Sequence, residues 1–206
     1  MIIKILNVGM FGTNCYIVGS ETSKDAMIID PGDDAGTILN TIVKLGLHVS
    51  LIVLTHIHGD HFGALKDIKK LSGATFAAYR DDFLGYTPEN LRNKVELNLQ
   101  FPGPLIKPDK WLSDGDELKV GEATFKVIHT PGHSSGGICI YSKGVLFSGD
   151  TLFNYGIGRT DLGGDFDTII RSINKLLTLP EDTVVYPGHG SKTTIGNEKR
   201  GNPFLR

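Results

Sequence analysis

Histidine is concentrated in three short parts of this chain. Six of its seven histidines lie in the runs 55–61 (THIHGDH), 129–133 (HTPGH) and 187–190 (PGHG). The first run holds three imidazoles and a carboxylate within six residues, directly after an apolar stretch typical of a β-strand. Imidazole and carboxylate are the protein ligands that zinc and its first-row neighbours prefer. Histidines that do not act together would be expected to lie scattered along the chain instead. We therefore predict a metal site, and a fold that brings several strand ends to it.

The length and charge of the chain indicate how many domains it forms and which partners it binds. With 206 residues it is expected to form a single domain, residues 1–206, with a substantial core. The net charge is −2 and no block of like charges occurs, so neither nucleic acid nor an anionic membrane is expected as a partner. The amino terminus has no signal-peptide pattern, and no apolar run approaches the ~18 residues that span a bilayer. We expect a cytoplasmic protein, and its oligomeric state stays open.

The two cysteines, Cys15 and Cys139, each lie within strand-like sequence. One disulfide between them is compatible with the sequence. Two isolated cysteines are, however, more typical of small core residues in a reducing compartment. We therefore predict free, buried thiols.

Turn residues and hydrophobic periodicity divide the chain into short strands and amphipathic helices. The expected strands are 2–8, 15–18, 26–29, 49–54, 75–78, 117–120, 123–128, 137–141, 145–147 and 183–186. The expected helices are 33–47, 60–71, 166–177 and 193–200. Asp33 or Asp34 is available as N-cap of the first helix. Residues 81–108 are polar and irregular, and they predict a helix-containing insertion at one edge, while its role as a lid over the site stays open. Together, these strands and helices predict an α/β fold with two groups of strands enclosed by helices.

One metal position follows from the first histidine run. The strand 49–54 ends just before it, and ligands of α/β proteins collect at the carboxyl ends of strands. Residues two apart in extended backbone point the same way, so His56 and His58 are expected to bind one ion together. His133, in a rigid turn after the strand 123–128, supplies a third imidazole for the same ion.

A second metal position is predicted beside the first. Asp60 and His61 begin a helix after a glycine bend and are expected to face this second ion. Asp150 follows a strand and is the candidate bridge between the two ions, and His189 completes the second set. Both aspartates have an alternative structural role, Asp60 as N-cap of its helix and Asp150 as a turn residue.

The two remaining histidines are not assigned as ligands. His129 precedes the turn of the second run, where a place in the core or behind the ligands is expected. His48 stands apart before a strand, has no motif partner and receives no role.

These residues resemble those of the metallo-β-lactamase superfamily of hydrolases. The similarity covers nearly the whole chain, from TNCY at 13–16 and IDPG at 29–32 through the three histidine runs. It implies an αββα sandwich of two mixed β-sheets flanked by helices, with a binuclear site between the sheets. The ligands of the first metal match His56, His58, His133 and Asp150, and those of the second match Asp60, His61, Asp150 and His189. Asp30 matches a carboxylate that supports the site from outside the ligand set.

Within this superfamily the chain is similar to the glyoxalase II branch. The similarity is carried by SGDTLF at 148–153, GIGRTD at 156–161 and the tail 193–204. Enzymes of that branch cleave the thioester of an acylated glutathione such as S-D-lactoylglutathione. The resemblance implies two divalent ions, with zinc expected and iron or manganese as alternatives, that hold a hydroxide between them as the nucleophile. It also implies that Asp60 acts catalytically, by orienting this hydroxide or handling its proton.

The same comparison assigns substrate contacts, with departures from the pattern. Arg159 falls where the eukaryotic enzymes have a glutathione-binding lysine, so a cation is kept. Asp161 and Ser191 replace two tyrosines, and a carboxy-terminal helical domain with further basic contacts has no counterpart, which leaves Lys199 and Arg200 as substitutes. Asp161 is a poor neighbour for an anionic peptide and is equally suited to pair with Arg159. A small-molecule thioester is the expected substrate, and its thiol carrier stays open.

Other functions also fit the sequence. The related persulfide dioxygenase branch resembles the run GRTD at 158–161 equally well, uses one iron at the first metal position and consumes oxygen. A non-catalytic metal-binding module is the third interpretation. It is less favoured, because a site that had lost its catalytic function would not need all seven ligand positions that this chain retains. A β-lactam substrate normally goes with secretion, and a nucleic-acid substrate with basic grooves, so both are less favoured.

Overall fold

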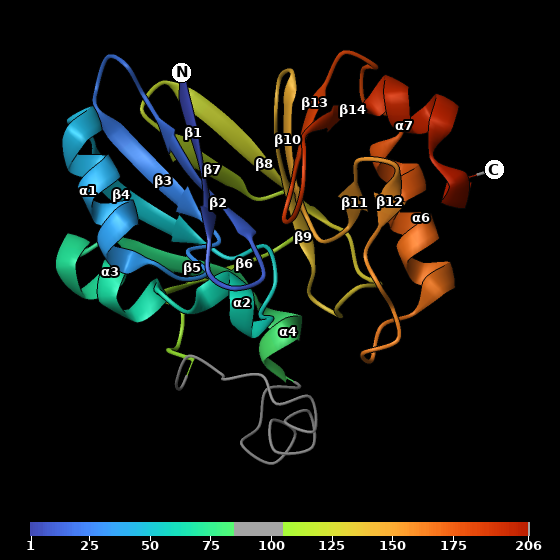
Figure 1. The fold of residues 1–206 in the computed structure, drawn as a ribbon, viewed down its shortest axis with the longest axis horizontal. Helices are drawn as coiled ribbons and strands as arrows, with labels where there is room; N and C mark the ends of the chain where they lie inside the picture. Colours follow the sequence, from blue (N-terminus) through green and yellow to red (C-terminus); the bar gives the residue numbers. More distant parts are fainter. Residues whose placement is uncertain (85–104, 206) are drawn as a thin grey trace.

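A computed structural model describes residues 1–84 and 105–205, and its strands form two six-stranded mixed sheets (Figure 1). The first sheet has the order β1-β2-β3-β4-β5-β6. Its strands are β1 (Ile2–Val8), β2 (Thr13–Gly19), β3 (Asp25–Ile29), β4 (His48–Val53), β5 (Thr75–Tyr79) and β6 (Lys110–Leu112). The first three strands pair antiparallel, and β3 through β6 pair parallel.

The second sheet has the order β14-β13-β10-β9-β8-β7. Its strands are β7 (Glu117–Val120), β8 (Ala123–His129), β9 (Ile138–Ser142), β10 (Val145–Gly149), β13 (Val184–Pro187) and β14 (Thr193–Thr194). Two antiparallel hairpins lie in this sheet, because β7 pairs with β8 and β9 with β10. A separate small hairpin joins β11 (Leu152–Phe153) to β12 (Gly156–Ile157).

Helices cover the outer faces of both sheets (Figure 1). The first sheet packs against α1 (Ala35–Leu45) and α3 (Leu65–Ser72), and the second against α6 (Phe166–Leu176) and α7 (Ile195–Gly201). The remaining elements are short: α2 (Gly59–Phe62), α4 (Arg80–Leu84) and the 3-10 turn η2 (Pro203–Leu205). This arrangement is the predicted αββα sandwich. Among the helices of the described residues, none is long and apolar enough to cross a bilayer.

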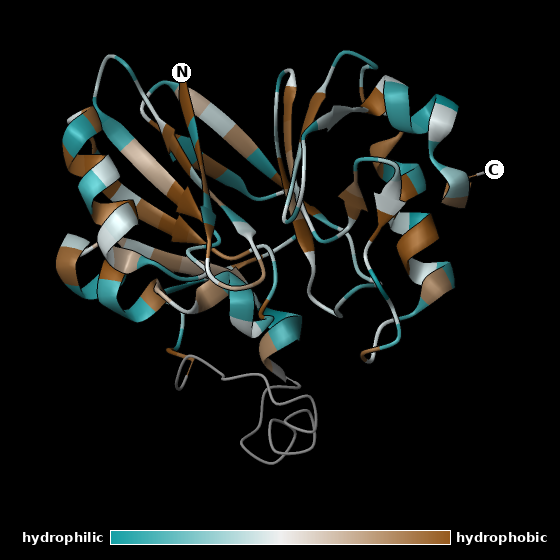
Figure 2. Cartoon of the chain, viewed as in Figure 1, coloured by the Kyte–Doolittle hydropathy of each residue, from teal (hydrophilic) through white to brown (hydrophobic). Residues whose placement is uncertain are grey.

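Side-chain alternation along the strands produces three separate cores. In β2, Cys15 and Ile17 join the core beneath α1 and α3, whereas Tyr16 and Val18 join the core between the sheets. A third core lies between the second sheet and α6. Figure 2 shows the strands mostly in hydrophobic colours, while the outer helices also carry hydrophilic residues. Both cysteines are free and buried, as predicted.

The predicted helix over 60–71 is wrong as a single element. α2 ends at Phe62 and α3 begins at Leu65. In a continuous helix the N–H of Ala64 would bond to the carbonyl of Asp60, four residues earlier. It donates instead to the carbonyl of Pro31 at 2.9 Å. The break leaves α2 as a single turn that holds its side chains close to the end of β4.

The expected side-chain cap of the first helix also differs. Asp34 occupies the N-cap position of α1 with φ of 54°, but its side chain makes no cap hydrogen bond. It accepts instead from the N–H of Gly9 at 3.1 Å. This aspartate therefore ties the β1–β2 loop to the start of α1.

Other departures follow from element length. The strands β6, β11, β12 and β14 have two or three residues each, which is too short for a periodic signal. α7 begins two residues later than expected, because Thr193 and Thr194 pair with β13. Most of the predicted insertion over 81–108 lies outside the described residues, so the question of a lid stays open.

Candidate metal centre

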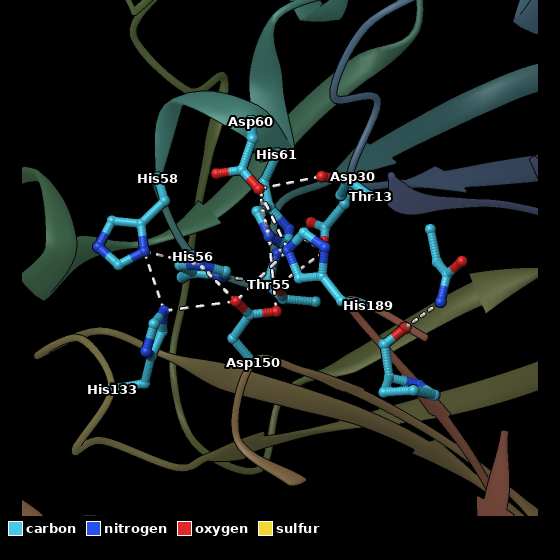
Figure 3. A network of polar contacts seen from close by, with 12 residues as sticks. Thr13, Asp30, Thr55, His56, His58, Asp60, His61, His133, Asp150 and His189 are labelled. Atoms are coloured by element: carbon cyan, nitrogen blue, oxygen red, sulfur yellow. Dashed lines mark hydrogen bonds and ion pairs between the residues drawn. The ribbon is translucent and has the colours of Figure 1, made fainter. Parts of the chain in front are cut away.

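The sequence-predicted ligands come together at the ends of strands from both sheets (Figure 3). His56 and His58 follow β4, and Asp60 and His61 lie in the single turn of α2. The others follow strands of the second sheet: His133 follows β8, Asp150 follows β10 and His189 follows β13. Three groups of these side chains have ligand atoms within 4.8 Å of one another: a first group of His56, His58 and His133, a second group of Asp60, His61 and His189, and a group of His56, His61 and Asp150 that connects them.

The first group consists of three imidazoles aimed at one point. Nδ1 of His58 lies 3.1 Å from Nε2 of His56 and 2.9 Å from Nε2 of His133. A ring nitrogen carries either one proton or one lone pair, so Nδ1 of His58 can make only one well-directed hydrogen bond with these two neighbours at a time. Three converging nitrogens are instead the donor set that zinc and similar cations take. The geometry therefore fits a cation at this position.

The second group combines a carboxylate with two imidazoles. Oδ2 of Asp60 lies 3.5 Å from Nε2 of His61 and 3.2 Å from Nε2 of His189. Thr13 donates a hydrogen bond from Oγ1 to the same oxygen at 3.0 Å. Asp60 follows the N-cap residue of α2, His58, and lies in the first turn, so its expected alternative role as N-cap is wrong.

Asp150 lies between the two groups. Its Oδ2 is 3.6 Å from Nε2 of His133 and 3.7 Å from Nε2 of His189, while its Oδ1 is 3.5 Å from Nε2 of His61. Among the described residues, neither Oδ1 of Asp150 nor Nε2 of His61 has a hydrogen-bond partner, although both atoms are buried. Burying polar atoms without partners is costly, and a cation between them removes that cost.

Glycines lie directly against the ligand residues, at places where a larger side chain would collide with the ligand atoms. A Cβ on Gly188 would overlap Oδ1 of Asp150 and come within 2.9 Å of a ring carbon of His61. A Cβ on Gly158 would overlap the carbonyl oxygen of Asp150. The glycines beside the histidine runs are thus explained by close approach of backbone to the site.

Hydrogen bonds hold the far nitrogens of the imidazoles. His61 donates from Nδ1 to Asp30 at 3.0 Å, and His133 donates from Nδ1 to the carbonyl of Arg159 at 2.7 Å. His189 donates from Nδ1 to the carbonyl of Phe11 at 3.2 Å. Partners of this kind fix the tautomer, so that each Nε2 presents its lone pair to the site.

Asp30 lies behind the ligands, where the resemblance places it. Its carboxylate accepts hydrogen bonds from both the N–H and the hydroxyl of Thr55, at 2.7 and 2.6 Å, besides the one from His61. It is almost fully buried and has φ of 52°, in the left-handed region that non-glycine residues rarely adopt. These contacts fix the strand end and the ring of His61 together.

When no cation is bound, burial and neighbouring charges shift the pKa values of the ligand residues in different directions. Burial lowers the pKa of His61, but the carboxylates of Asp150, Asp30 and Asp60 outweigh burial and raise this pKa to about 9. Burial and then the neighbouring imidazoles lower the pKa of His56 well below its usual value. Burial raises the pKa of Asp60, but its contacts with His189, His61 and Thr13 prevail and lower it well below the usual range.

Metal binding is therefore expected to release protons. At pH 7 His61, with its pKa near 9, is protonated, and the pKa of His189 is also raised, because its contacts with Asp60 and Asp150 outweigh burial. A cation binds only the neutral imidazole, so about one to two protons should leave per chain at pH 7, and fewer above pH 9. Zinc titration calorimetry in buffers of different ionisation enthalpy measures this number. The exposed His48→Gln variant should leave the count unchanged, and zinc binding without proton release at pH 7 would contradict the prediction.

The predicted substrate contacts do not point at the ligand groups in the described residues. The guanidinium of Arg159 pairs with Asp161 through two hydrogen bonds of 2.7 and 2.6 Å, and both side chains are exposed. Lys199 and Arg200 both face Glu181, at 3.7 and 3.0 Å. Only the backbone of Arg159 contacts a ligand, through His133.

The other two histidines lie away from the ligand groups. His129 was expected in the core or behind the ligands, and that expectation is wrong. Its half-exposed ring stacks on Tyr79 at 4.3 Å and bonds through Nε2 to the carbonyl of Ser135. His48 is exposed at the start of β4.

Sequence reasoning gave no role to two buried polar residues that contact the ligand loops, Asp82 and Asn14. Asp82 lies in α4 and bonds to the loops of the first group, and Asn14 lies in β2 and bonds to the loop of His189. Asp82 belongs to a stretch without periodic pattern, and Asn14 is an isolated polar residue in a strand-like run. Neither leaves a signal in one sequence that reveals its distant partners.

Two mixed sheets between helices, with histidines and aspartates gathered at the strand ends, define the metallo-hydrolases of the αββα type. The chain belongs to the metallo-β-lactamase superfamily, whose family model matches residues 8–189. Members of this superfamily bind divalent metals, which agrees with the donor sets described above. The predicted fold and superfamily are both confirmed.

Similar proteins cover the whole chain. Hydroxyacylglutathione hydrolase GloC of Haemophilus influenzae is 41% identical, over 100% of this chain and 98% of the relative. The crystal structure of BLEG-1 B3 metallo-beta-lactamase is 40% identical with a TM-score of 0.90, and the alignment covers 99% of both chains. The crystal structure of TTHA1623 in a di-iron-bound form is 36% identical with a TM-score of 0.86, covering 98% of this chain and 100% of that one.

Proposed function

We propose that this protein is a dinuclear metal-dependent hydrolase that cleaves the thioester of an acylated small thiol. The observation that carries the proposal is the pairing of two adjacent donor groups through Asp150, with buried atoms that a cation would satisfy. The full-length similarity to hydroxyacylglutathione hydrolase GloC supports a thioester as the substrate class. The buried free thiols of Cys15 and Cys139 agree with action in a reducing compartment such as the cytoplasm.

Seven residues would hold the two ions. His56, His58 and His133 serve the first position, Asp60, His61 and His189 serve the second, and Asp150 contributes to both. Divalent ions bound there would polarise the thioester carbonyl and make water nucleophilic near neutral pH. Imidazole and carboxylate donors suit zinc and also accept iron or manganese, and the similarity to a protein crystallised in a di-iron-bound form keeps iron in consideration.

The protein's own groups orient the reaction. Asp60 is partly exposed and ionised at neutral pH, so it acts as a hydrogen-bond acceptor that orients the attacking water. Thr13 fixes one carboxylate oxygen of Asp60 and leaves the other free for this task. The rigid imidazoles behind it keep the reacting atoms in place without reorganisation.

Recognition of the thiol carrier would involve Arg159 and Lys199. Each cation is paired with an acid, so binding of an anionic carrier requires exchange of Asp161 or Glu181 for a substrate carboxylate. Exposed ion pairs of this kind are weak, and such an exchange is energetically accessible. Glutathione therefore belongs to the proposed class of small thiol carriers, but the proposal is not limited to glutathione.

An assay with three substrates tests the proposal. The zinc-loaded protein is given S-D-lactoylglutathione, an acyl thioester of an uncharged thiol, and a chromogenic β-lactam, because BLEG-1 is described as a metallo-beta-lactamase. We expect metal-dependent release of free thiol from at least one thioester. Turnover of the β-lactam alone would overturn the proposal.

Metal content and oxygen consumption separate the remaining alternatives. Two ions per chain with no oxygen uptake support the hydrolase. One iron per chain, with oxygen uptake on a persulfide, would replace it by a dioxygenase. A loaded protein that is inert towards all of these substrates would favour the non-catalytic module.

A further inference from the structure

Asp82 is a buried carboxylate outside the proposed ligand set. It lies in α4 and is 7% exposed. Its three hydrogen bonds come from neutral donors: the N–H of Ile57, the hydroxyl of Ser134 and the N–H of Gly136. A buried carboxylate must be fully hydrogen-bonded to remain in such a place, so these contacts bind the connected segments firmly together.

The segments that Asp82 connects are the two loops of the first metal position. Ile57 separates His56 from His58, and its N–H lies 3.1 Å from Oδ2 of Asp82. On the other side, Ser134 directly follows His133, and its Oγ lies 3.2 Å from the same oxygen. One carboxylate thus connects the loop after β4 with the loop after β8, and these two loops carry the three converging imidazoles.

The backbone around Gly136 leaves little freedom in this contact. Its N–H lies 2.5 Å from Oδ1 of Asp82, and a Cβ on Gly136 would overlap the backbone nitrogen of Asp82. The loop after His133 and the start of α4 are therefore in direct contact. Movement of Asp82 would shift His133 relative to His56 and His58.

Asn14 has the corresponding place at the second metal position. It is 5% exposed in β2, and its side-chain amide donates to the carbonyls of Pro187 and Gly190, at 3.0 and 2.9 Å. These carbonyls flank His189 on both sides. The backbone N–H of Asn14 also donates to the carbonyl of Gly188 at 2.7 Å. The loop of His189 is thus held by one residue of the opposite sheet.

From these contacts we infer that Asp82 and Asn14 are positioning residues, each of which sets the geometry of one metal position. Asp82 aligns the three imidazoles of the first position, and Asn14 aligns His189 at the second. The inference rests on the proposed metal pair, but not on the identity of the substrate. Partners behind metal ligands typically change metal affinity by about 10–100-fold.

The test measures zinc affinity at one position at a time. His189→Ala leaves the first position with its three imidazoles, and His133→Ala leaves the second. In each background the zinc dissociation constant is determined by competition with a chromophoric chelator. Asp82→Asn, which keeps the size but places a donor against donors, should weaken zinc binding about 10–100-fold in the first background and less than about threefold in the second. Asn14→Leu, which keeps the branched shape without donors, should show the reverse.

Controls separate positioning from loss of folding. Asp81→Asn makes the same charge change at the exposed neighbouring residue and should leave both affinities unchanged. If Asp82→Asn unfolds at the assay temperature, Ser134→Ala removes one of the three hydrogen bonds and should weaken the first position alone. If Asn14→Leu unfolds, Asn14→Ala leaves room for water and should weaken the second alone.

Three results would overturn the inference. Equal losses in both backgrounds would show a general structural role, and unchanged affinities in folded variants would show that neither residue positions a ligand. Zinc binding in neither background, with the parent protein also failing to bind, would contradict the metal pair itself. That last result differs from a failure of thioester hydrolysis alone, which leaves the inference intact.

Discussion

Replacing Asp150 with alanine is expected to abolish tight binding of the metal pair and to lower thioester hydrolysis by at least about 10²–10³-fold, the loss typical of removing one electrostatic stabiliser. The reason is its position between the two donor groups. Its carboxylate lies within 4.0 Å of four imidazole nitrogens, those of His56, His61, His133 and His189. It therefore contacts imidazoles of both metal positions. Elemental analysis together with a thiol-release assay measures the effect.

A matched control and a contrary result define this test. Asp67→Ala removes an exposed aspartate from α3 and should keep both the metal content and the activity. If Asp150→Ala retained two ions per chain and near-normal hydrolysis, Asp150 would be the turn residue of the alternative interpretation. Loss of one ion with full activity would likewise contradict a reaction that uses both positions.

The sequence predicted an α/β fold with two groups of strands enclosed by helices because its signals are local, and the resemblance to the superfamily implied the αββα arrangement. Apolar segments with β-branched residues mark β2, β4 and β8, and the spacing of Ile169 and Ile173 marks the buried face of α6. The sequence signals that reveal the ligand residues are local as well. Each follows a recognisable strand, so the rule that ligands collect at strand ends places them at one edge.

The parts that the sequence did not predict depend on contacts between distant segments. The break between α2 and α3 arises because the N–H of Ala64 bonds to Pro31, more than thirty residues earlier. The expected helix was a reasonable result of periodicity, but tertiary contact overrode it. Asp82 and Asn14 present the same problem at the site, since their partners lie in the loops of Ser134 and Gly190.

The side chain of Arg159 illustrates a choice that the sequence left open. Its position matched a substrate-binding cation, and Asp161 was equally suited to pair with it. In the structure its guanidinium pairs with Asp161, and its carbonyl accepts a hydrogen bond from His133. Side-chain pairing depends on the neighbouring residue, which in this chain is acidic, and substrate binding by Arg159 stays a prediction.

Removing the metal with a chelator should lower the melting temperature substantially. An ion that binds only the native state stabilises it by about 4 kcal/mol when its concentration is a thousandfold above its dissociation constant. In a chain of this size each kcal/mol shifts the melting temperature by about 2–4 °C, so each position should contribute about 8–16 °C. Without a cation, Nε2 of His61 and Oδ1 of Asp150 are buried without hydrogen-bond partners among the described residues, which adds to the cost of folding.

Thermal unfolding followed by circular dichroism measures this difference, with zinc, with chelator, and with zinc restored after chelation. The restored sample should recover the higher melting temperature, whereas magnesium, which prefers oxygen ligands, should not replace zinc. The zinc-dependent shift should also shrink as the pH falls from 8 to 6. His61 is protonated below its pKa of about 9, so protons compete more strongly with the cation at the lower pH. Equal melting temperatures in all three samples would contradict a metal site, because the five imidazoles and two carboxylates would then form the same stable cluster without an ion.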